Sequence, residues 1–243
     1  MHLFTTPDFG LANRLRGLVA AWAHAKQAGH TLDILWTESP ACPYDIRALF
    51  DPLPGTRYIQ SPDQENEYTY ESSDLGQLNE TLAKHGLRAT MAPLLIASLK
   101  PVQSIRDRIR TIAASVPLSE CLGLHIRRTD MIPYAASLGL EDPNPLGAFW
   151  AICDARPSVP LFLACDDKKT VRACRARYGK RVYVAKEIDS STEGIRATDG
   201  VHAVLDLYCL AHCKYFQGSP LSSFTTHVDY LREAWAMSPS LKL

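Results

Sequence analysis

Apolar residues near the start of the chain recur at the spacing of a helix and are then followed by the pattern of a strand. Within 15–25 the apolar positions that repeat every three or four residues are Leu15, Leu18, Val19, Trp22 and Ala25. This period predicts a helix with one buried face, and the apolar run at 31–36 predicts a strand after it. A helix followed by a strand opens an α/β fold.

The second half of the chain continues this alternation with short connections. The pattern predicts strands at 121–126, 161–165, 181–185 and 214–217. It predicts helices at 145–153, 168–178 and 200–212, and a last helix after Ser222. Strands and helices that alternate in this way form a doubly wound parallel sheet.

A junction between two domains is expected after residue 116. A helix that begins near Pro101 ends at Val116, and the regular alternation starts directly after it. We therefore predict Rossmann-like domains at 1–116 and 117–243. Within the first domain, the acidic stretch 62–74 is interpreted as a solvated loop, with a lid over a ligand as the alternative.

Composition narrows the classes of protein and of partner. The 243 residues are 46% hydrophobic and 21% charged, which is typical of globular proteins, and 26 basic residues balance 26 acidic ones. Without a basic excess we expect no binding to nucleic acid, and any anion site must be local. No apolar run approaches the about 18–20 residues that span a bilayer, so no transmembrane segment is expected.

The cysteines and the N-terminus indicate a compartment. Seven cysteines, an odd number, are spread through apolar segments, which predicts buried free thiols rather than a disulfide framework. The N-terminus lacks a basic region followed by an apolar one, so we expect no secretory signal. Both features favour a cytoplasmic protein.

Two arginines stand at a position where parallel sheets bind ligands. Arg127 and Arg128 directly follow the strand 121–126, and ligands lie beyond the carboxyl ends of parallel strands. The planar fork of a guanidinium can grip phosphate oxygens in two hydrogen bonds, so the pair is a candidate diphosphate clamp. The alternative is that one arginine pairs with Asp130 and the other faces water.

Two further turns have the chemistry of ligand loops. The turn 218–224 follows the strand 214–217 and opens the last helix, where hydroxyls and free amides can bind an anion, although ordinary helix capping accounts for it equally well. The turn 9–14 contains a glycine before the first helix and is a candidate to face a ligand. The acidic pair Asp166 and Asp167 resembles a metal site, but Asp167 is expected to be the N-cap of the next helix.

These segments, taken together and in order, resemble a known family. The stretch 125–130 (His-Ile-Arg-Arg-Thr-Asp) resembles the nucleotide-binding motif of the α1,6-fucosyltransferase superfamily, to which nodulation-type and core enzymes belong and protein O-fucosyltransferases are distantly related. The segments 163–167, 200–208 with 221–223, and 10–14 are similar to further motifs of that family. The resemblance is weak between 37 and 98.

The resemblance implies the GT-B arrangement of two facing Rossmann-like domains, the first on the acceptor side, with GDP-fucose held by the second and with no metal ion or other cofactor. Arg127 would contact the β-phosphate and take part in catalysis. Asp206 would read guanine, although the residues alone favour a buried helix acid paired with a neighbour such as His202. The remaining substrate-binding candidates are His125, Arg128, Ser222, Ser223, Gly10, Asn13 and Arg14.

The catalytic base is left open by the sequence. An acceptor hydroxyl needs a carboxylate that takes its proton, and Asp130 and Glu141 are the candidates in the loop after the clamp strand. The chain departs from the family here, since Met131 replaces a lysine common in the core enzymes and the loop 132–144 differs in length.

The resemblance thus implies an inverting, metal-independent enzyme that moves fucose from GDP-fucose to a glycan hydroxyl, its partners being the nucleotide sugar and the glycan. Two alternatives are another nucleotide-sugar donor on the same fold, and a nucleotide-sugar-binding protein without turnover. The compact length favours a bacterial or viral cytoplasmic enzyme.

Overall fold

The computed structural model describes residues 1–4, 9–60, 69–71, 78–139, 141–186 and 199–243. Most of the acidic stretch 62–74 lies outside these ranges, and there its assignment to a loop stays a prediction. Within the stretch, Thr69–Glu71 form a strand of a sheet, so the assignment is wrong for these three residues. Contacts between residues divide the chain into two units. Unit 1 comprises Met1–Gln103 and Tyr230–Leu243, and unit 2 comprises Ser104–Asp229.

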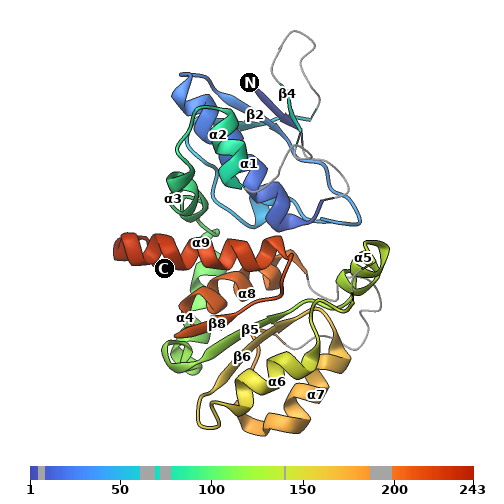
Figure 1. The fold of residues 1–243 in the computed structure, drawn as a ribbon. Helices are drawn as coiled ribbons and strands as arrows, with labels where there is room; N and C mark the ends of the chain where they lie inside the picture. The colour runs from blue at the N-terminus through green and yellow to red at the C-terminus, as the bar shows by residue number, and fades with distance from the viewer. Residues whose placement is uncertain (5–8, 61–68, 72–77, 140, 187–198) are drawn as a thin grey trace. The chain divides into compact units, whose positions relative to one another are not determined.

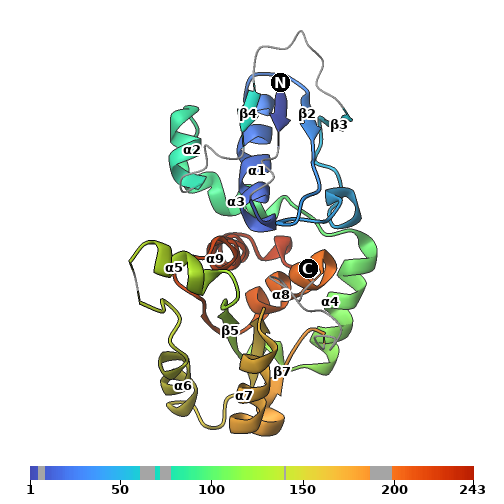
Figure 2. The ribbon, with the colours of Figure 1, turned by 90° about the vertical axis from the view of Figure 1, so that its right-hand side faces the viewer.

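Unit 1 is built on four parallel strands (Figure 2). They are β1 (His2–Phe4), β2 (Leu32–Leu35), β3 (Thr56–Tyr58) and β4 (Thr69–Glu71), in the order β3-β2-β1-β4. The helices are α1 (Leu11–Gln27), α2 (Leu78–Lys84) and α3 (Ala92–Ala97), with short 3-10 turns at Ile46–Ala48 and Ala89–Met91. The apolar stripe of α1 is buried, as its spacing predicts.

Unit 2 has a second sheet of four parallel strands (Figure 1). They are β5 (Leu122–Ile126), β6 (Leu161–Cys165), β7 (Val182–Tyr183) and β8 (Tyr215–Gln217), in the order β7-β6-β5-β8. Its helices are α4 (Gln103–Ser115), α5 (Met131–Ser137), α6 (Leu146–Asp154), α7 (Lys168–Tyr178) and α8 (Gly200–His212), with short 3-10 turns at Leu118–Glu120 and Gly179–Arg181. Helix α9 (Ser223–Met237) begins in unit 2 and ends in unit 1, where the 3-10 turn Pro239–Leu241 follows it.

The two sheets share one strand order. In each, the first strand of the unit lies in the interior, with the second and third on one side and the fourth on the other. This is the order of a Rossmann-like half, and the chain reverses its direction of winding between the first and fourth strands. The prediction of an α/β chain with two parallel sheets is confirmed, and the switch point of unit 2 lies between β5 and β8.

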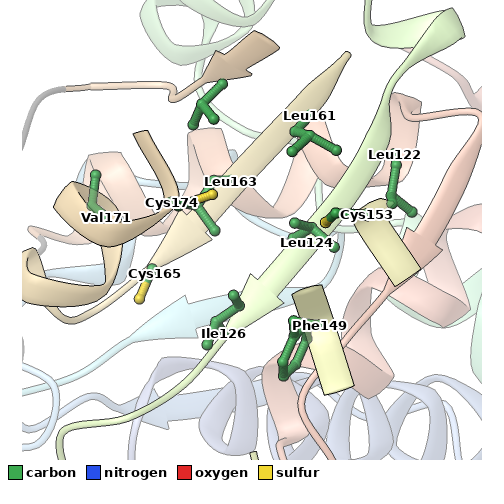
Figure 3. Packing of buried hydrophobic residues seen from close by; sticks show 11 residues of the cluster. Leu122, Leu124, Ile126, Phe149, Cys153, Leu161, Leu163, Cys165, Val171 and Cys174 are labelled. Atoms are coloured by element: carbon green, nitrogen blue, oxygen red, sulfur yellow. The ribbon is translucent and has the colours of Figure 1, made fainter. Parts of the chain in front are cut away.

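Strand β5 is buried on both faces, and each face has its own partner. Leu122, Leu124 and Ile126 pack into a cluster with Phe149 of α6 (Figure 3). On the opposite face, a Cβ on Gly123 would lie 3.0 Å from Cys213 Sγ, so the strand packs closely beneath the end of α8 and a larger residue would push Cys213 aside. Because side chains alternate along a strand, His125 shares the face of Gly123 rather than that of the apolar cluster.

Two features differ from the sequence-based expectation. The segment expected to be a loop after the clamp strand contains α5, which tolerates Pro133 because the first turn of a helix has no partner for that amide. The boundaries between the two units also lie elsewhere than expected: one follows Gln103 and one precedes Tyr230, whereas a single junction after Val116 was expected. Ile105 and Ile109 of α4 are buried, and helical spacing alone does not tell which unit buries them.

The remaining whole-chain expectations concern thiols and membranes. All seven cysteines are free and buried, which confirms that prediction. Over the described ranges, no helix combines the length and the apolar character needed to cross a bilayer.

Candidate functional site

A single hydroxyl joins the two strands at the switch point of unit 2. Ser219 follows β8, and its side chain is almost fully buried at 1% exposure. Its Oγ donates to the carbonyl of His125 at 3.0 Å and accepts from the amide of Arg127 at 2.8 Å. The turn after β8 is thereby fixed to the backbone that presents the arginine pair.

A second hydroxyl sets the orientation and tautomer of His125. Thr225 Oγ1 donates to the carbonyl of Ser219 at 2.9 Å, so it accepts from Nδ1 of His125, also at 2.9 Å. The Nδ1–H tautomer leaves Nε2 as an acceptor. The ring stacks on Phe224 with 4.6 Å between centroids, and burial, helped by the charge of Arg127, lowers the pKa of His125 to about 3. The histidine is therefore neutral at physiological pH.

The turn that opens α9 is shaped for close approach. A Cβ on Gly218 would lie 2.2 Å from Cγ2 of Thr225, so the backbone there requires glycine. Leu221 is exposed and has a φ of 60°, which is strained for a branched side chain. Ser222 is 3% exposed, and its Oγ has no hydrogen-bond partner in the described part of the chain. The side chain of Ser222 therefore does not cap α9, whose first residue is Ser223.

Arg127 is engaged with a carboxylate. Its Nε donates to Oδ1 of Asp130 at 2.7 Å, and its Nη2 donates to Oδ2. Both side chains are about a quarter exposed, at 25% and 24%. Burial would lower the pKa of Arg127, but the hydrogen bond and charge of Asp130, with the charge of Asp166, raise it. The ion pair with Asp130 that the sequence left open is present.

Arg128 was expected to face water if the two arginines did not form a phosphate clamp, and in the structure it does not face water. Its Nη1 donates to Oδ2 of Asp142 and, at 2.8 Å, to the carbonyl of Asn144. The chain turns back at 142–145, Asp-Pro-Asn-Pro, and brings an acid to this arginine across the loop. Each guanidinium of the pair thus has its own aspartate.

Asn144 is a functional candidate that the sequence analysis missed. It is fully buried, and its Nδ2 donates to the carbonyl of Arg127 at 2.9 Å, while its amide donates to Asp142 Oδ1 at 2.9 Å. Its Oδ1 is buried without a partner in the described residues. The available signal was the turn chemistry of two Asx-Pro dipeptides, which marks a fixed turn but not the strand that it contacts.

The acidic pair after β6 divides into two structural roles. Asp166 accepts from the amide of Arg128 at 2.8 Å and from Thr129 Oγ1 at 2.7 Å, and so it fixes the loop beyond β5. Asp167 accepts from the amide of Thr170 at 2.8 Å and caps α7, as expected. In the described ranges no three His, Cys, Asp or Glu side chains gather into a metal-binding group.

Asp206 lies on α8 and is buried beside His202. The exposure of Asp206 is 5%, and its Oδ2 lies 3.5 Å from Nε2 of His202. Burial, with a smaller contribution from the charge of Asp199, raises the pKa of Asp206 well above its usual range, and burial lowers the pKa of His202 to about 4. Oδ1 is buried and has no partner among the described residues. The pairing with His202 is present, and one carboxyl oxygen is left over.

Neither candidate base is poised as a free carboxylate inside the site. Both oxygens of Asp130 bind Arg127. Glu141 is exposed and makes no hydrogen bond with any residue that the structure describes. The identity of the base stays a prediction.

The glycine turn of unit 1 holds its arginine inward. Arg14 is fully buried, and its Nε donates to the carbonyl of Phe9 at 2.8 Å, Nη2 to Ser39 Oγ at 2.7 Å, and Nη1 to the carbonyl of Thr37. These bonds tie the start of α1 to the segment after β2. Gly10 is the N-cap residue of α1, and Asn13 accepts from Arg16 through Oδ1.

Comparison of the sequence alone finds no relative. No protein-family model matches the chain. No curated protein matches it either.

Solved structures do match, over nearly the whole chain. The fucosyltransferase NodZ from Bradyrhizobium superposes with a TM-score of 0.63 at 18% identity, covering 94% of this chain and 92% of that one. NodZ alpha-1,6-fucosyltransferase soaked with GDP-fucose gives 0.60 at 19%, covering 95% and 92%. POFUT1 in complex with GDP-fucose gives 0.59 at 12%, covering 96% and 94%. The chain therefore has the α/β fold of GT-B fucosyltransferases.

Proposed function

We propose that the protein is an inverting glycosyltransferase that transfers fucose from GDP-fucose to a hydroxyl of a glycan without a metal ion. One observation carries the proposal: paired arginines lie at the β5/β8 switch point, beside a hydroxyl-lined turn that opens a helix. Open parallel sheets bind ligands at such points. The fold shared with NodZ and POFUT1 supports fucosyl transfer over other chemistry at this position.

The arginines would stabilise the leaving diphosphate. As the bond to fucose breaks, negative charge grows on the β-phosphate of GDP, and donors that strengthen with that charge lower the barrier. The guanidinium of Arg127 donates two hydrogen bonds to Asp130 in the structure. On donor binding, the β-phosphate would replace the Asp130 carboxylate as the acceptor of these bonds. Arg128, kept in place by Asp142 and Asn144, would supply a second positive charge.

The turn before α9 would complete the phosphate site. Amides in the first turn of a helix point along its axis and favour anions. The buried Oγ of Ser222 has no partner among the residues that the structure describes, so it would be able to donate to a phosphate oxygen, with Ser223 one residue further on.

Two groups could read the nucleoside. Asp206 has an unpartnered Oδ1, and a carboxylate accepts from the N1–H and exocyclic amine of guanine together. Those donors would favour the ionised form that burial otherwise opposes. The acceptor Nε2 of neutral His125 would face the base or the ribose.

Removal of the acceptor proton could be coupled to donor binding. When the β-phosphate takes over Arg127, Asp130 loses its partner and becomes available as a general base. Glu141 is the second candidate, from the exposed end of the same loop.

One observation favours a second candidate, a nucleotide-sugar-binding protein without turnover. In the described structure, Asp130 is occupied by Arg127, and Glu141 is exposed. A protein with the clamp but no working base would bind the donor and stop there.

Calorimetric titration with GDP, UDP and ADP, in EDTA and then with magnesium, tests the donor assignment. We expect GDP to bind selectively in EDTA, and Arg127→Ala to weaken it by about 2 kcal/mol, the scale of a charged hydrogen bond left unmade. Arg110→Ala is the matched control, since Arg110 sits in an exposed ion pair on α4 and should leave GDP affinity unchanged. A preference for UDP, or binding only with magnesium, would refute the donor and the mechanism.

Conservative variants of the two acids separate an enzyme from a binding protein. We expect Asp130→Asn to abolish transfer while GDP affinity is kept or increased, because Arg127 no longer has to exchange one carboxylate for a phosphate. Glu141→Gln is the companion variant. Transfer is followed as GDP release from GDP-fucose with a mixed glycan acceptor. If both variants transfer at the wild-type rate, neither acid is the base.

A further inference from the structure

Two buried arginines stand two residues apart on α1 but differ in their partners. Arg14 donates to three separate acceptors within unit 1. Arg16 is 9% exposed, and among the described residues its guanidinium makes a single hydrogen bond, from Nη2 to Asn13 Oδ1. Its Nε is buried with no partner. The contrast singles out Arg16 as a buried cation that the described residues satisfy only in part.

The surroundings of Arg16 supply no counter-charge. No described carboxylate forms an ion pair with it, and the one side chain that accepts from its guanidinium is the neutral Asn13. The titratable group that acts electrostatically on Arg16 is Tyr230, whose hydroxyl donates to Asn79 Oδ1 at 3.2 Å. Burial raises the pKa of Tyr230 and lowers the pKa of Arg16, so the phenol is neutral and no described residue compensates the charge of Arg16.

An unpaired buried charge is costly, and a ligand of opposite charge would offset that cost. Without such a ligand, the described part of the chain holds Arg16 at the expense of stability. Asn13 adds a second donor, because its Oδ1 is taken by Arg16 and its amide nitrogen remains on a partly exposed side chain. The two side chains together present N–H groups and one positive charge.

We propose that Arg16 and Asn13 form a binding site for a carboxylate. A planar guanidinium matches the two oxygens of a carboxylate in parallel hydrogen bonds. Its single charge balances a monoanion, whereas a phosphate dianion would leave one negative charge buried. If the proposed glycosyltransferase function holds, the carboxylate belongs to an acidic sugar of the acceptor, such as a uronic acid.

The test compares melting temperatures of the full chain in sodium glucuronate and in sodium chloride of the same ionic strength, with glucose as the uncharged analogue. Glucuronate should raise the melting temperature of the wild type in a saturable way, and glucose should not. Arg16→Met should abolish that rise, yet without ligand it should melt at or above the wild-type temperature, since it removes an unpaired buried charge. Arg14→Met is the matched control and should melt lower, because it removes three hydrogen bonds that hold the start of α1 to the segment after β2.

Several results would overturn the site: no rise specific to glucuronate, a rise that Arg16→Met retains, or destabilisation by Arg16→Met as large as that by Arg14→Met. A larger Arg16-dependent rise with inorganic phosphate would refute the carboxylate assignment. If Arg16→Met does not fold, Arg16→Lys replaces it, keeps the charge without the planar fork, and should weaken the glucuronate effect. The donor assignment stands apart, because it is measured by GDP titration against Arg127→Ala.

Discussion

At the scale of single residues, the site depends on atoms that touch across the switch point. There is no room for a side chain at position 218, because Thr225 fills the space. Thr225 also fixes the tautomer of His125 through its hydrogen bond with Nδ1. Ser219 closes the same network from the other strand. One missing Cβ thus supports the geometry in which the arginines are presented.

Gly218→Ala should disrupt this network. The new Cβ would clash with Cγ2, Oγ1 and Cβ of Thr225. We therefore expect a loss of about 1–3 kcal/mol in the free energy of unfolding, and weaker GDP binding. Urea denaturation and GDP titration measure the two effects.

Gly147→Ala is the matched control for Gly218→Ala. Gly147 lies in α6 with open space around its Cα, so alanine should stabilise the protein by about 0.5–1 kcal/mol and leave GDP binding as it is. Equal effects of the two alanines would show that the Thr225 contact is unimportant.

At the scale of elements, the two adjacent acids after β6 stabilise different parts of unit 2: one a helix and the other a loop. The side chain of Asp167 caps the start of α7, whereas Asp166 accepts from the amides and the hydroxyl of the loop after β5. Adjacent residues therefore support separate parts of unit 2, and their variants should separate stability from binding.

Asp167→Ala should cost about 1 kcal/mol of stability, as the loss of an N-cap does, with GDP affinity unchanged. Asp166→Ala should also weaken GDP binding, because the backbone of Arg128 and Thr129 loses its acceptor. Chemical denaturation paired with GDP titration distinguishes the two. A loss of GDP affinity in Asp167→Ala alone would reverse the assignment.

The sequence predicted the elements with strong periodicity and missed the contacts that depend on loop paths. The helices 168–178 and 200–212 match the structure end to end because caps and apolar spacing mark them. Helix α5 was missed since its seven residues are too short to show a period. The bond from Asn144 to Arg127 spans seventeen positions, and no local pattern encodes which turn returns to which strand.

At the scale of the whole molecule, the thiols are distributed unevenly. Cys42 is the one cysteine of unit 1, and the other six lie in unit 2. All are buried, and burial raises the pKa of Cys121 to about 11 and that of Cys174 to about 12. Neither their accessibility nor their ionisation favours reaction in the folded state.

Thiol labelling with a coloured disulfide reagent should therefore report on unfolding. We expect none of the seven thiols to react quickly in the native protein and all seven to react in denaturant. At intermediate denaturant, the amplitude of the first phase tells which unit opens, since one thiol belongs to unit 1 and six to unit 2. Rapid labelling of the native chain would contradict the burial.

The division of the chain into units has a consequence for recombination. Unit 2 is one uninterrupted segment, and unit 1 is completed by Tyr230–Leu243 at the far end of the sequence, within the helix α9 that begins in unit 2. Along the coding sequence, the segment for unit 2 is therefore flanked on both sides by segments for unit 1. A chimera with a single crossover near Gln103 would thus pair the body of one parent's unit 1 with the other parent's closing helical segment. An exchange of unit 2 between homologues needs two crossovers, the second in the middle of a helix.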